Sequence, residues 1–277
     1  MERLQRFAVT SVVSGLACFA LARTNNIMLT GYWPNTNEML RQFSDNPKQN
    51  PGGWQGKNWE NRGYDVYAFF PEFPGGSFPV GEGDFTVDYQ DTSADWARIT
   101  AKIEPLSIIT FSRGSNGPLW EIETKQRNLV TWVDDYVAPF QPTPSPPDAT
   151  FAPNGIRYSS LPTAAIASAV NGAGLGLNAF VDTTGFGGGF LSEFIAYHGV
   201  WHRDDRVAPG TPDQCFMSGH VHVGTDVSVG TGILATEVTL RTTLDELDTL
   251  VPEPATWITL SGLGLLALLR SRRKPCE

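Results

Sequence analysis

The feature that most constrains the fold is an alternation of short apolar runs with longer amphipathic segments. The apolar runs have the length of buried strands, and the segments between them have the length and capping residues of helices. Strands that alternate with helices form a mostly parallel sheet with helices on both faces. We therefore expect a single α/β domain around a mostly parallel central sheet. The expected strands are 26–30, 64–70, 106–111, 120–133, 177–183 and 219–224, and the expected helices are 35–43, 92–103, 161–172, 191–201 and 232–250.

The N-terminal end has the three parts of a secretory signal peptide. A short cationic start, MERLQRF, precedes an apolar stretch that ends in Ala20-Leu21-Ala22, which has the small-x-small pattern of a cleavage site. Residues 1–22 are therefore predicted to be a signal peptide that signal peptidase removes, and the protein is predicted to be exported.

The C-terminal end, residues 251–277, also has three parts. Pro252-Glu253-Pro254 precedes a mostly apolar run at 257–269, and basic residues follow at 270–274. This tail resembles a PEP-CTERM sorting signal. The resemblance implies recognition by an exosortase-type enzyme and a C-terminal helix that anchors the chain transiently in the membrane. The protein would then reach the cell surface or the exterior of a Gram-negative bacterium. Cleavage and retention of the tail both stay open, as does an ordinary tail anchor.

The middle segment, residues 23–250, has the length of one large domain. The chain has 20 basic and 29 acidic residues, and its two ends hold six of the basic and three of the acidic ones. The middle segment therefore carries 14 basic and 26 acidic residues and a net charge of −12. Such an acidic domain is not attracted to nucleic acid by charge. Cys215 is its one cysteine, so no disulfide can form within it. No cofactor is expected, because the glycine-rich GFGGGF lacks the spacing of a dinucleotide-binding motif and the Lys-Ser/Thr of a P-loop.

Residues that could act as a nucleophile, a base or an acid lie near the ends of the expected strands. Ser192 begins an expected helix after a glycine-rich turn, where a serine can cap the helix or present a nucleophile. His220 and His222 share one face of a strand, as do Glu121 and Glu123. A nucleophile, an imidazole base and an orienting carboxylate make up a catalytic triad. Spacing alone does not show whether these residues meet.

Several stretches resemble the pyroglutamyl peptidase I (pyrrolidone-carboxylate peptidase) family. The segment RYSSLPTAAIASAVNGAGLGLNAFVDTTGFGGGFLSEF is similar to the stretch that leads to the family's nucleophile, and this places Ser192 on that position. GHVHVG resembles the motif of the catalytic histidine, and ETKQRN that of the catalytic glutamate. The resemblance implies the family's fold, a triad of Ser192, His222 and Glu123, and a substrate pocket partly lined by Tyr32 and Trp33 of MLTGYWPNT.

The departures from the family leave the function open. The family has a cysteine where this chain has Ser192, and an asparagine where it has Glu193, whose charge would disfavour an oxyanion nearby. Arg113 only loosely matches the arginine before the family's glutamate. The chain is therefore predicted to be a serine-type amide or ester hydrolase with a peptide or small amide substrate. The alternative is a non-catalytic binding protein of the envelope or extracellular matrix.

A histidine-based metal site is the third interpretation. All four histidines of the chain, His198, His202, His220 and His222, fall within 25 residues and have spacings that suit zinc. We expect no metal, because the pair on a helix should diverge from the pair on a strand.

Overall fold

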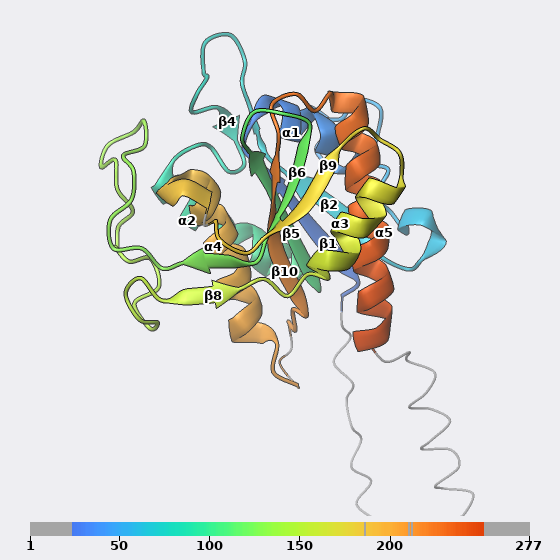
Figure 1. Cartoon of the computed structure of the whole chain (residues 1–277). Helices are drawn as coiled ribbons and strands as arrows, with labels where there is room; N and C mark the ends of the chain where they lie inside the picture. Colours follow the sequence, from blue (N-terminus) through green and yellow to red (C-terminus); the bar gives the residue numbers. More distant parts are fainter. Residues whose placement is uncertain (1–23, 186, 210, 212, 252–277) are drawn as a thin grey trace, which may run out of the picture.

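The computed structural model describes residues 24–185, 187–209, 211 and 213–251 (Figure 1). The predicted signal peptide and nearly all of the sorting tail lie outside these residues. Within them, no helix combines the length and the apolar character that crossing a membrane requires. The helices are α1 (Pro34–Leu40), α2 (Tyr89–Ile103), α3 (Thr163–Gly172), α4 (Leu191–Arg206) and α5 (Val229–Leu250). The strands are β1 (Asn26–Gly31), β2 (Asp65–Phe69), β3 (Pro71–Glu72), β4 (Glu82–Gly83), β5 (Ser107–Arg113), β6 (Leu119–Glu123), β7 (Lys125–Arg127), β8 (Ile156–Tyr158), β9 (Asn178–Asp182) and β10 (Met217–Val223).

Six strands form the central sheet in the order β2-β1-β5-β10-β6-β9. The first four run parallel to one another, and β6 runs antiparallel to β10 while β9 is parallel to β6. The prediction of an α/β domain with a mostly parallel sheet is therefore confirmed. Two short antiparallel pairs, β3 with β4 and β7 with β8, lie outside this sheet.

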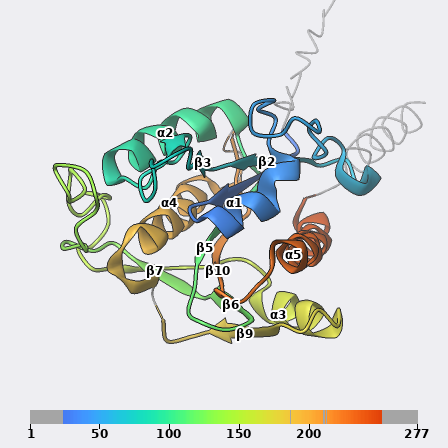
Figure 2. The same cartoon turned by 90° about the horizontal axis from the view of Figure 1, so that it is seen from above.

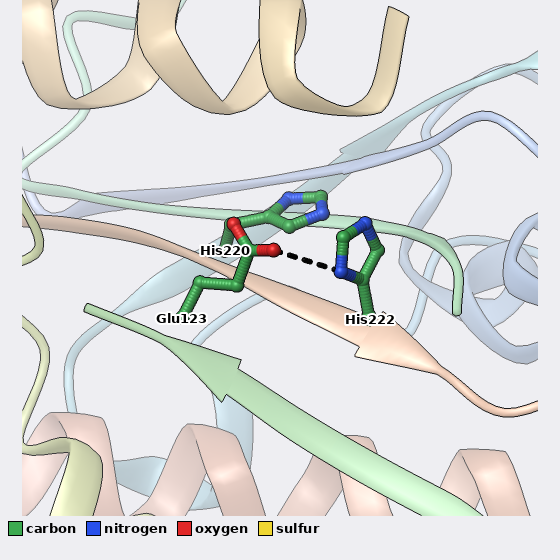
Figure 3. A group of neighbouring side chains, drawn as sticks. All are labelled: Glu123, His220 and His222. Atoms are coloured by element: carbon green, nitrogen blue, oxygen red, sulfur yellow. Dashed lines mark ion pairs between the residues drawn. The ribbon is translucent and has the colours of Figure 1, made fainter. Parts of the chain in front are cut away.

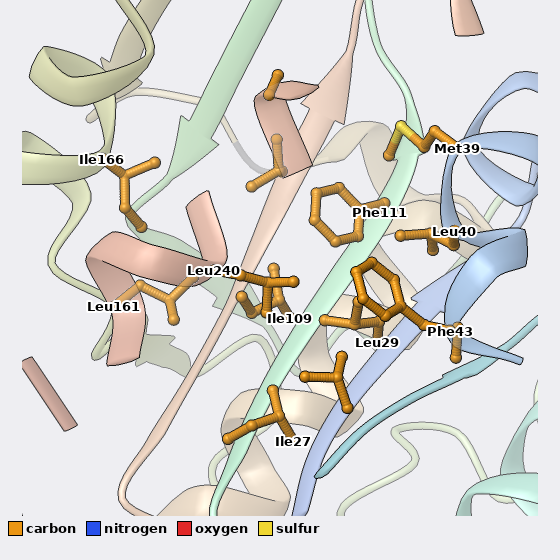
Figure 4. Packing of buried hydrophobic residues seen from close by; sticks show 14 of the residues in the cluster. Ile27, Leu29, Met39, Leu40, Phe43, Ile109, Phe111, Leu161, Ile166 and Leu240 are labelled. Atoms are coloured by element: carbon orange, nitrogen blue, oxygen red, sulfur yellow. The ribbon is translucent and has the colours of Figure 1, made fainter. Parts of the chain in front are cut away.

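Helices cover both faces of the sheet, as the view from above shows (Figure 2). One face packs against α1, α3 and α5, and the other against α2 and α4. Successive residues of a strand point to opposite faces, so Ile27 and Leu29 of β1 belong to the first core and Met28 to the second. Both faces are buried, which explains why β1 and β5 are apolar without alternation. Figure 4 shows the first core, in which Leu29 and Phe111 from the sheet lie near Leu40 of α1.

The helix α4 lies close to the sheet because of one glycine. A Cβ atom on Gly199 would stand 2.7 Å from Ser218 Oγ on β10, and 3.7 and 3.8 Å from Trp96 and Ile108. The first distance is shorter than real Cβ contacts allow, so any larger residue at position 199 would require Ser218 Oγ or the helix to move. The approach matters because α4 carries Ser192 at its N-terminal end.

We expect Gly199→Val to lower the free energy of unfolding by about 1–3 kcal/mol, because the added carbons overpack the contact between α4 and β10. Urea denaturation followed by circular dichroism measures the change. Gly230→Ala in α5 is the matched control, since its Cβ would meet nothing within 4 Å. Equal stability of the Gly199 variant and the unmodified domain would contradict the close packing.

Candidate active site

The candidate site lies where β10, β6 and the start of α4 meet. His220 and His222 stand two residues apart on β10, so they point to the same face of the sheet. The register of the antiparallel pair places Glu123 of β6 opposite His220, and Glu121 opposite His222. The four side chains therefore share one face at neighbouring positions. The sequence predicted each pair separately, and the strand register brings the two pairs together.

Glu123 and His222 form a buried ion pair (Figure 3). His222 Nδ1 donates to Glu123 Oε1 at 2.9 Å, and the same oxygen accepts the Gly187 N–H at 2.9 Å. Gln126 donates its amide to the other oxygen. Burial alone would raise the pKa of Glu123, but the His222 hydrogen bond and the nearby imidazoles hold it below its ordinary value. The carboxylate therefore stays charged.

The same pair determines the protonation behaviour of His222. Burial would lower the pKa of this imidazole, but the hydrogen bond to Glu123 and the negative charges of Glu123, Glu121 and Asp182 raise it above its ordinary value. With Nδ1 donating to Glu123, the other ring nitrogen, Nε2, carries the lone pair in the neutral form. Nε2 has no hydrogen-bond partner among the described residues, and the ring lines a hollow that Ser192 also lines. The imidazole is thus oriented as a base.

His220 is a neutral neighbour of this pair. Its Nδ1 lies 2.7 Å from Thr110 Oγ1 and its Nε2 2.9 Å from Ser112 Oγ, both on β5. Complete burial lowers the pKa of His220 to about 3. The ring stands edge-on to His222 with the centroids 4.5 Å apart. His220 therefore supports the position of His222 without adding a charge.

Ser192 is the second residue of α4, directly after a glycine-rich turn. The N-cap of α4 is Phe190, and the cap makes no side-chain hydrogen bond. The Ser192 hydroxyl instead donates to the Gly187 carbonyl at 2.9 Å. The interpretation as a helix cap is therefore wrong, because among the described residues this hydroxyl donates to a carbonyl and accepts no backbone N–H. No hydrogen bond joins Ser192 to His222 within the described part of the chain.

Two hollows meet at Ser192, and Arg113 also lines both. One has a volume of about 310 Å³ and contains the predicted substrate-binding residues Tyr32 and Trp33. The other has a volume of about 460 Å³ and contains Glu123 and His222. The first is further lined by Phe78, Pro79, Val87, Ser112, Tyr136, Phe190 and Leu191, and the second by Gly114, Ser115, Glu121, Asp182, Gly185, Gly187 and Gly188.

Glu193, which departs from the family pattern, is neutralised by an ion pair. Arg127 of β7 donates from Nε and Nη2 to its two carboxylate oxygens at 2.8 and 2.9 Å. The Gly189 N–H donates to the same carboxylate at 2.7 Å. Because an arginine offsets its charge, Glu193 does not present an unpaired anion beside Ser192. It holds the glycine-rich turn against α4 instead.

Asp182, at the end of β9, is the site residue that sequence reasoning missed. Its carboxyl group interacts with that of Glu121, and both line the 460 Å³ hollow. Burial and the contact with Asp182 raise the pKa of Glu121 to about 7. The signal that could have found Asp182 is its place at the carboxyl end of a strand, where ligands bind in open α/β sheets.

The four histidines do not form one ligand set. His198 and His202 lie on α4, where Trp96 of α2 stacks on His198 at a centroid distance of 5.6 Å, and they line a separate hollow between α2 and α4. Among the described residues, the group whose potential ligand atoms all lie within 4.8 Å of one another is Glu123, His220 and His222. These three could hold a metal ion, but only if His220 gave up a hydrogen bond to Thr110 or Ser112.

The comparisons with known proteins address the two parts of the chain separately. A profile of the PEP-CTERM protein-sorting motif matches residues 250–274. No curated protein sequence matches the chain.

Solved structures match the α/β domain. Pyrrolidone carboxyl peptidase from Thermococcus litoralis superposes with a TM-score of 0.58 and 16% identity, over 83% of this chain and 100% of that chain. The structure of the same peptidase from Pyrococcus furiosus, described together with its Cys-free mutant, superposes with a TM-score of 0.56 and 16% identity, over 80% of this chain and 99% of that chain. At this identity the likeness establishes the fold alone. The sorting motif indicates export, C-terminal membrane anchoring for sorting and recognition by an exosortase-type enzyme. The chain therefore carries a PEP-CTERM sorting motif, which indicates export, and its α/β domain has the fold of pyrrolidone carboxyl peptidase.

Proposed function

We propose that the domain is a serine-type hydrolase of amide or ester bonds, with Ser192 as nucleophile, His222 as base and Glu123 as the orienting carboxylate. The observation that supports it is the 2.9 Å bond from His222 Nδ1 to Glu123, which leaves Nε2 free beside the hollow that Ser192 lines. The arrangement has the roles of the Ser-His-acid triad.

The reaction begins with a change in one side-chain torsion. Ser192 Oγ leaves the Gly187 carbonyl for another staggered rotamer and donates to His222 Nε2. His222 takes the hydroxyl proton while Oγ bonds to the substrate carbonyl carbon. The imidazolium is stabilised by Glu123, which is already charged and buried.

The oxyanion of the tetrahedral intermediate would lie at the start of α4. The first N–H groups of a helix have no partner within the helix, and the N-terminus attracts negative charge. In α4 these groups belong to Leu191, Ser192 and Glu193. They supply the donors that such an intermediate requires.

The cycle closes by proton transfers through His222. The imidazolium gives its proton to the leaving nitrogen or oxygen as the bond to the carbonyl carbon breaks, which leaves an ester on Ser192. Water then attacks the ester, with His222 accepting its proton and returning one to Oγ. The aromatic hollow at Tyr32 and Trp33 would hold the acyl portion throughout.

We expect a fluorophosphonate probe to label the purified domain at Ser192, because the probe captures serines that a base activates. Ser192→Ala and His222→Ala should both lose the label. Ser115→Ala is the matched control, since Ser115 lines the same hollow but takes no part in the proposed triad. Intact mass and peptide mapping measure the labelling. Circular dichroism checks folding, because Ser192→Ala removes one hydrogen bond worth about 0.5–1.5 kcal/mol.

An unlabelled wild-type domain would contradict the hydrolase proposal. If that domain also holds no metal, the non-catalytic binding protein on the same fold takes its place. If it holds one zinc ion that is lost in His220→Gln, the cluster of Glu123, His220 and His222 is a metal site instead.

The rate of labelling should rise with pH and level off only above the ordinary histidine value of 6.5, because Glu123 raises the pKa of His222 and only the neutral ring is a base. In Glu123→Gln the burial of His222 still lowers its pKa, but the charge of Glu123 no longer raises it. The rise of the labelling rate should therefore occur at a lower pH. The plateau should fall by roughly 10²–10⁴-fold.

Stopped labelling reactions across the acid and neutral range measure this profile. Glu121→Gln is included because Glu121, with a pKa of about 7, faces the same imidazole. Glu60→Gln, which affects a surface ion pair with Arg241, is the control. Superimposable profiles for wild type and Glu123→Gln would rule out the proposed role of Glu123.

We also propose that residues 1–22 are a signal peptide and that the tail beyond about residue 250 is removed during sorting. The proposal is supported by the sorting motif at 250–274. The intact mass of the protein from its native host should then correspond to a chain that begins near Arg23 and lacks the tail. A full-length chain in the cytoplasm would disprove it.

A further inference from the structure

The two hollows that meet at Ser192 differ in chemistry. The 310 Å³ hollow has aromatic and apolar walls that include Trp33, Phe78 and Tyr136. The 460 Å³ hollow is lined mainly by glycine backbone and by the carboxyl groups of three acidic residues, together with Arg113 at the junction, Ser115 and His222. A bond that Ser192 attacks lies at their junction, so the two portions of the substrate meet different surroundings.

The position of His222 decides which portion lies where. The imidazole must reach the leaving atom to protonate it, so the leaving portion lies on the side of His222. His222 lines the 460 Å³ hollow and not the 310 Å³ hollow. Only 7% of the surface of His222 is exposed, and its Nε2 has no hydrogen-bond partner among the described residues. The leaving portion therefore enters the hollow with the carboxyl walls.

Asp182 is fixed in that hollow by backbone groups. Its Oδ1 accepts the N–H groups of Thr184 and Gly185, both at 2.7 Å. Burial would raise the pKa of Asp182, but these backbone hydrogen bonds hold it below its ordinary value. The backbone thus holds Asp182 in place in this hollow and favours its charged form.

Glu121 adds a second acidic group beside it. Glu121 on β6 pairs with His222 of β10 on one edge and with Phe180 of β9 on the other. Asp182 stands two residues after Phe180 on β9, so its side chain lies on the same face of the sheet as Glu121. Neither Glu121 nor Asp182 forms an ion pair with a lysine or arginine in the described part of the chain, and the histidine is the cation that acts on Glu121. Two adjacent carboxyl groups that face one hollow without a lysine or arginine partner repel each other when both are charged, and a cationic group of a ligand between them relieves that repulsion.

We propose that Glu121 and Asp182 bind a positively charged group on the leaving portion of the substrate. The preferred substrates are then amides or peptides with an apolar or aromatic acyl group and a lysine-like or arginine-like leaving portion. This inference rests on the proposed function, because the serine reaction defines the two sides of the bond.

Binding to the Ser192→Ala domain, which cannot form the acyl enzyme, tests the inference without turnover. The probes are N-phenylacetyl-lysinamide and N-phenylacetyl-norleucinamide, which differ chiefly in the terminal ammonium group. Calorimetric titration at low salt should show the lysine compound binding roughly tenfold or more tightly, as expected for hydrogen bonds to a charged group. Adding Asp182→Asn or Glu121→Gln should bring the ratio close to one. Adding Glu82→Gln, an exposed acid on β4, should leave it intact.

Equal affinities for the two compounds would overturn the inference, as would a preference that survives both Asp182→Asn and Glu121→Gln, or no binding of either compound. The serine reaction is judged separately by hydrolysis and fluorophosphonate labelling of the wild-type domain. A charge-dependent preference in Ser192→Ala without labelling of the wild type would support the cation site and reject the hydrolase.

Discussion

The buried carboxylate of Glu123 is the interaction on which the site depends. A charge that is 99% buried is stable only when it is paired and hydrogen bonded, and Glu123 meets that requirement through His222, Gln126 and the Gly187 N–H. These partners come from β10, from β7 and from the turn before α4. One desolvated charge therefore fixes the tautomer of the imidazole and the path of the glycine-rich turn. The position of Ser192 follows, because its hydroxyl is bonded to the carbonyl of Gly187.

The neighbouring histidines show that environment decides the chemistry of a side chain. His222 has a carboxylate partner and an elevated pKa, whereas His220, two residues away, has only hydroxyl partners and stays neutral. On α4, burial against Trp96 lowers the pKa of His198 and of His202 to about 3. The spacing that suggested zinc ligands in that helix arises from packing between α2 and α4.

The sequence was sufficient for the order of the five helices and the six strands of the central sheet, because apolar runs and helical segments follow local periodicity. It did not predict the short strands β3, β4 and β8, and the strand predicted at 120–133 is wrong beyond β6, because β7 leaves the central sheet to pair with β8. The motif resemblance was sufficient to select Glu123, Ser192 and His222 as candidates. The contact between Glu121 and Asp182 was not predictable, since it depends on how β6 and β9 pair, and a shift of one residue would turn either side chain to the other face. The donor role of Ser192 depends on the backbone path of Gly187, whose positive φ of 63° is not encoded by local periodicity.

The place of β10 in the sheet affects when the domain can assemble. This strand lies between β5 and β6, yet among the described residues it is the last strand in sequence, and α5 is the helix that follows it. A nascent chain that ends before residue 217 has two separate halves of a sheet and lacks His222. Folding must wait for pairings between segments that are distant in sequence, which is slow compared with local helix formation. Until β10 has been made, the shorter chain therefore lacks both the strand that joins the two halves of the sheet and the imidazole that pairs with Glu123.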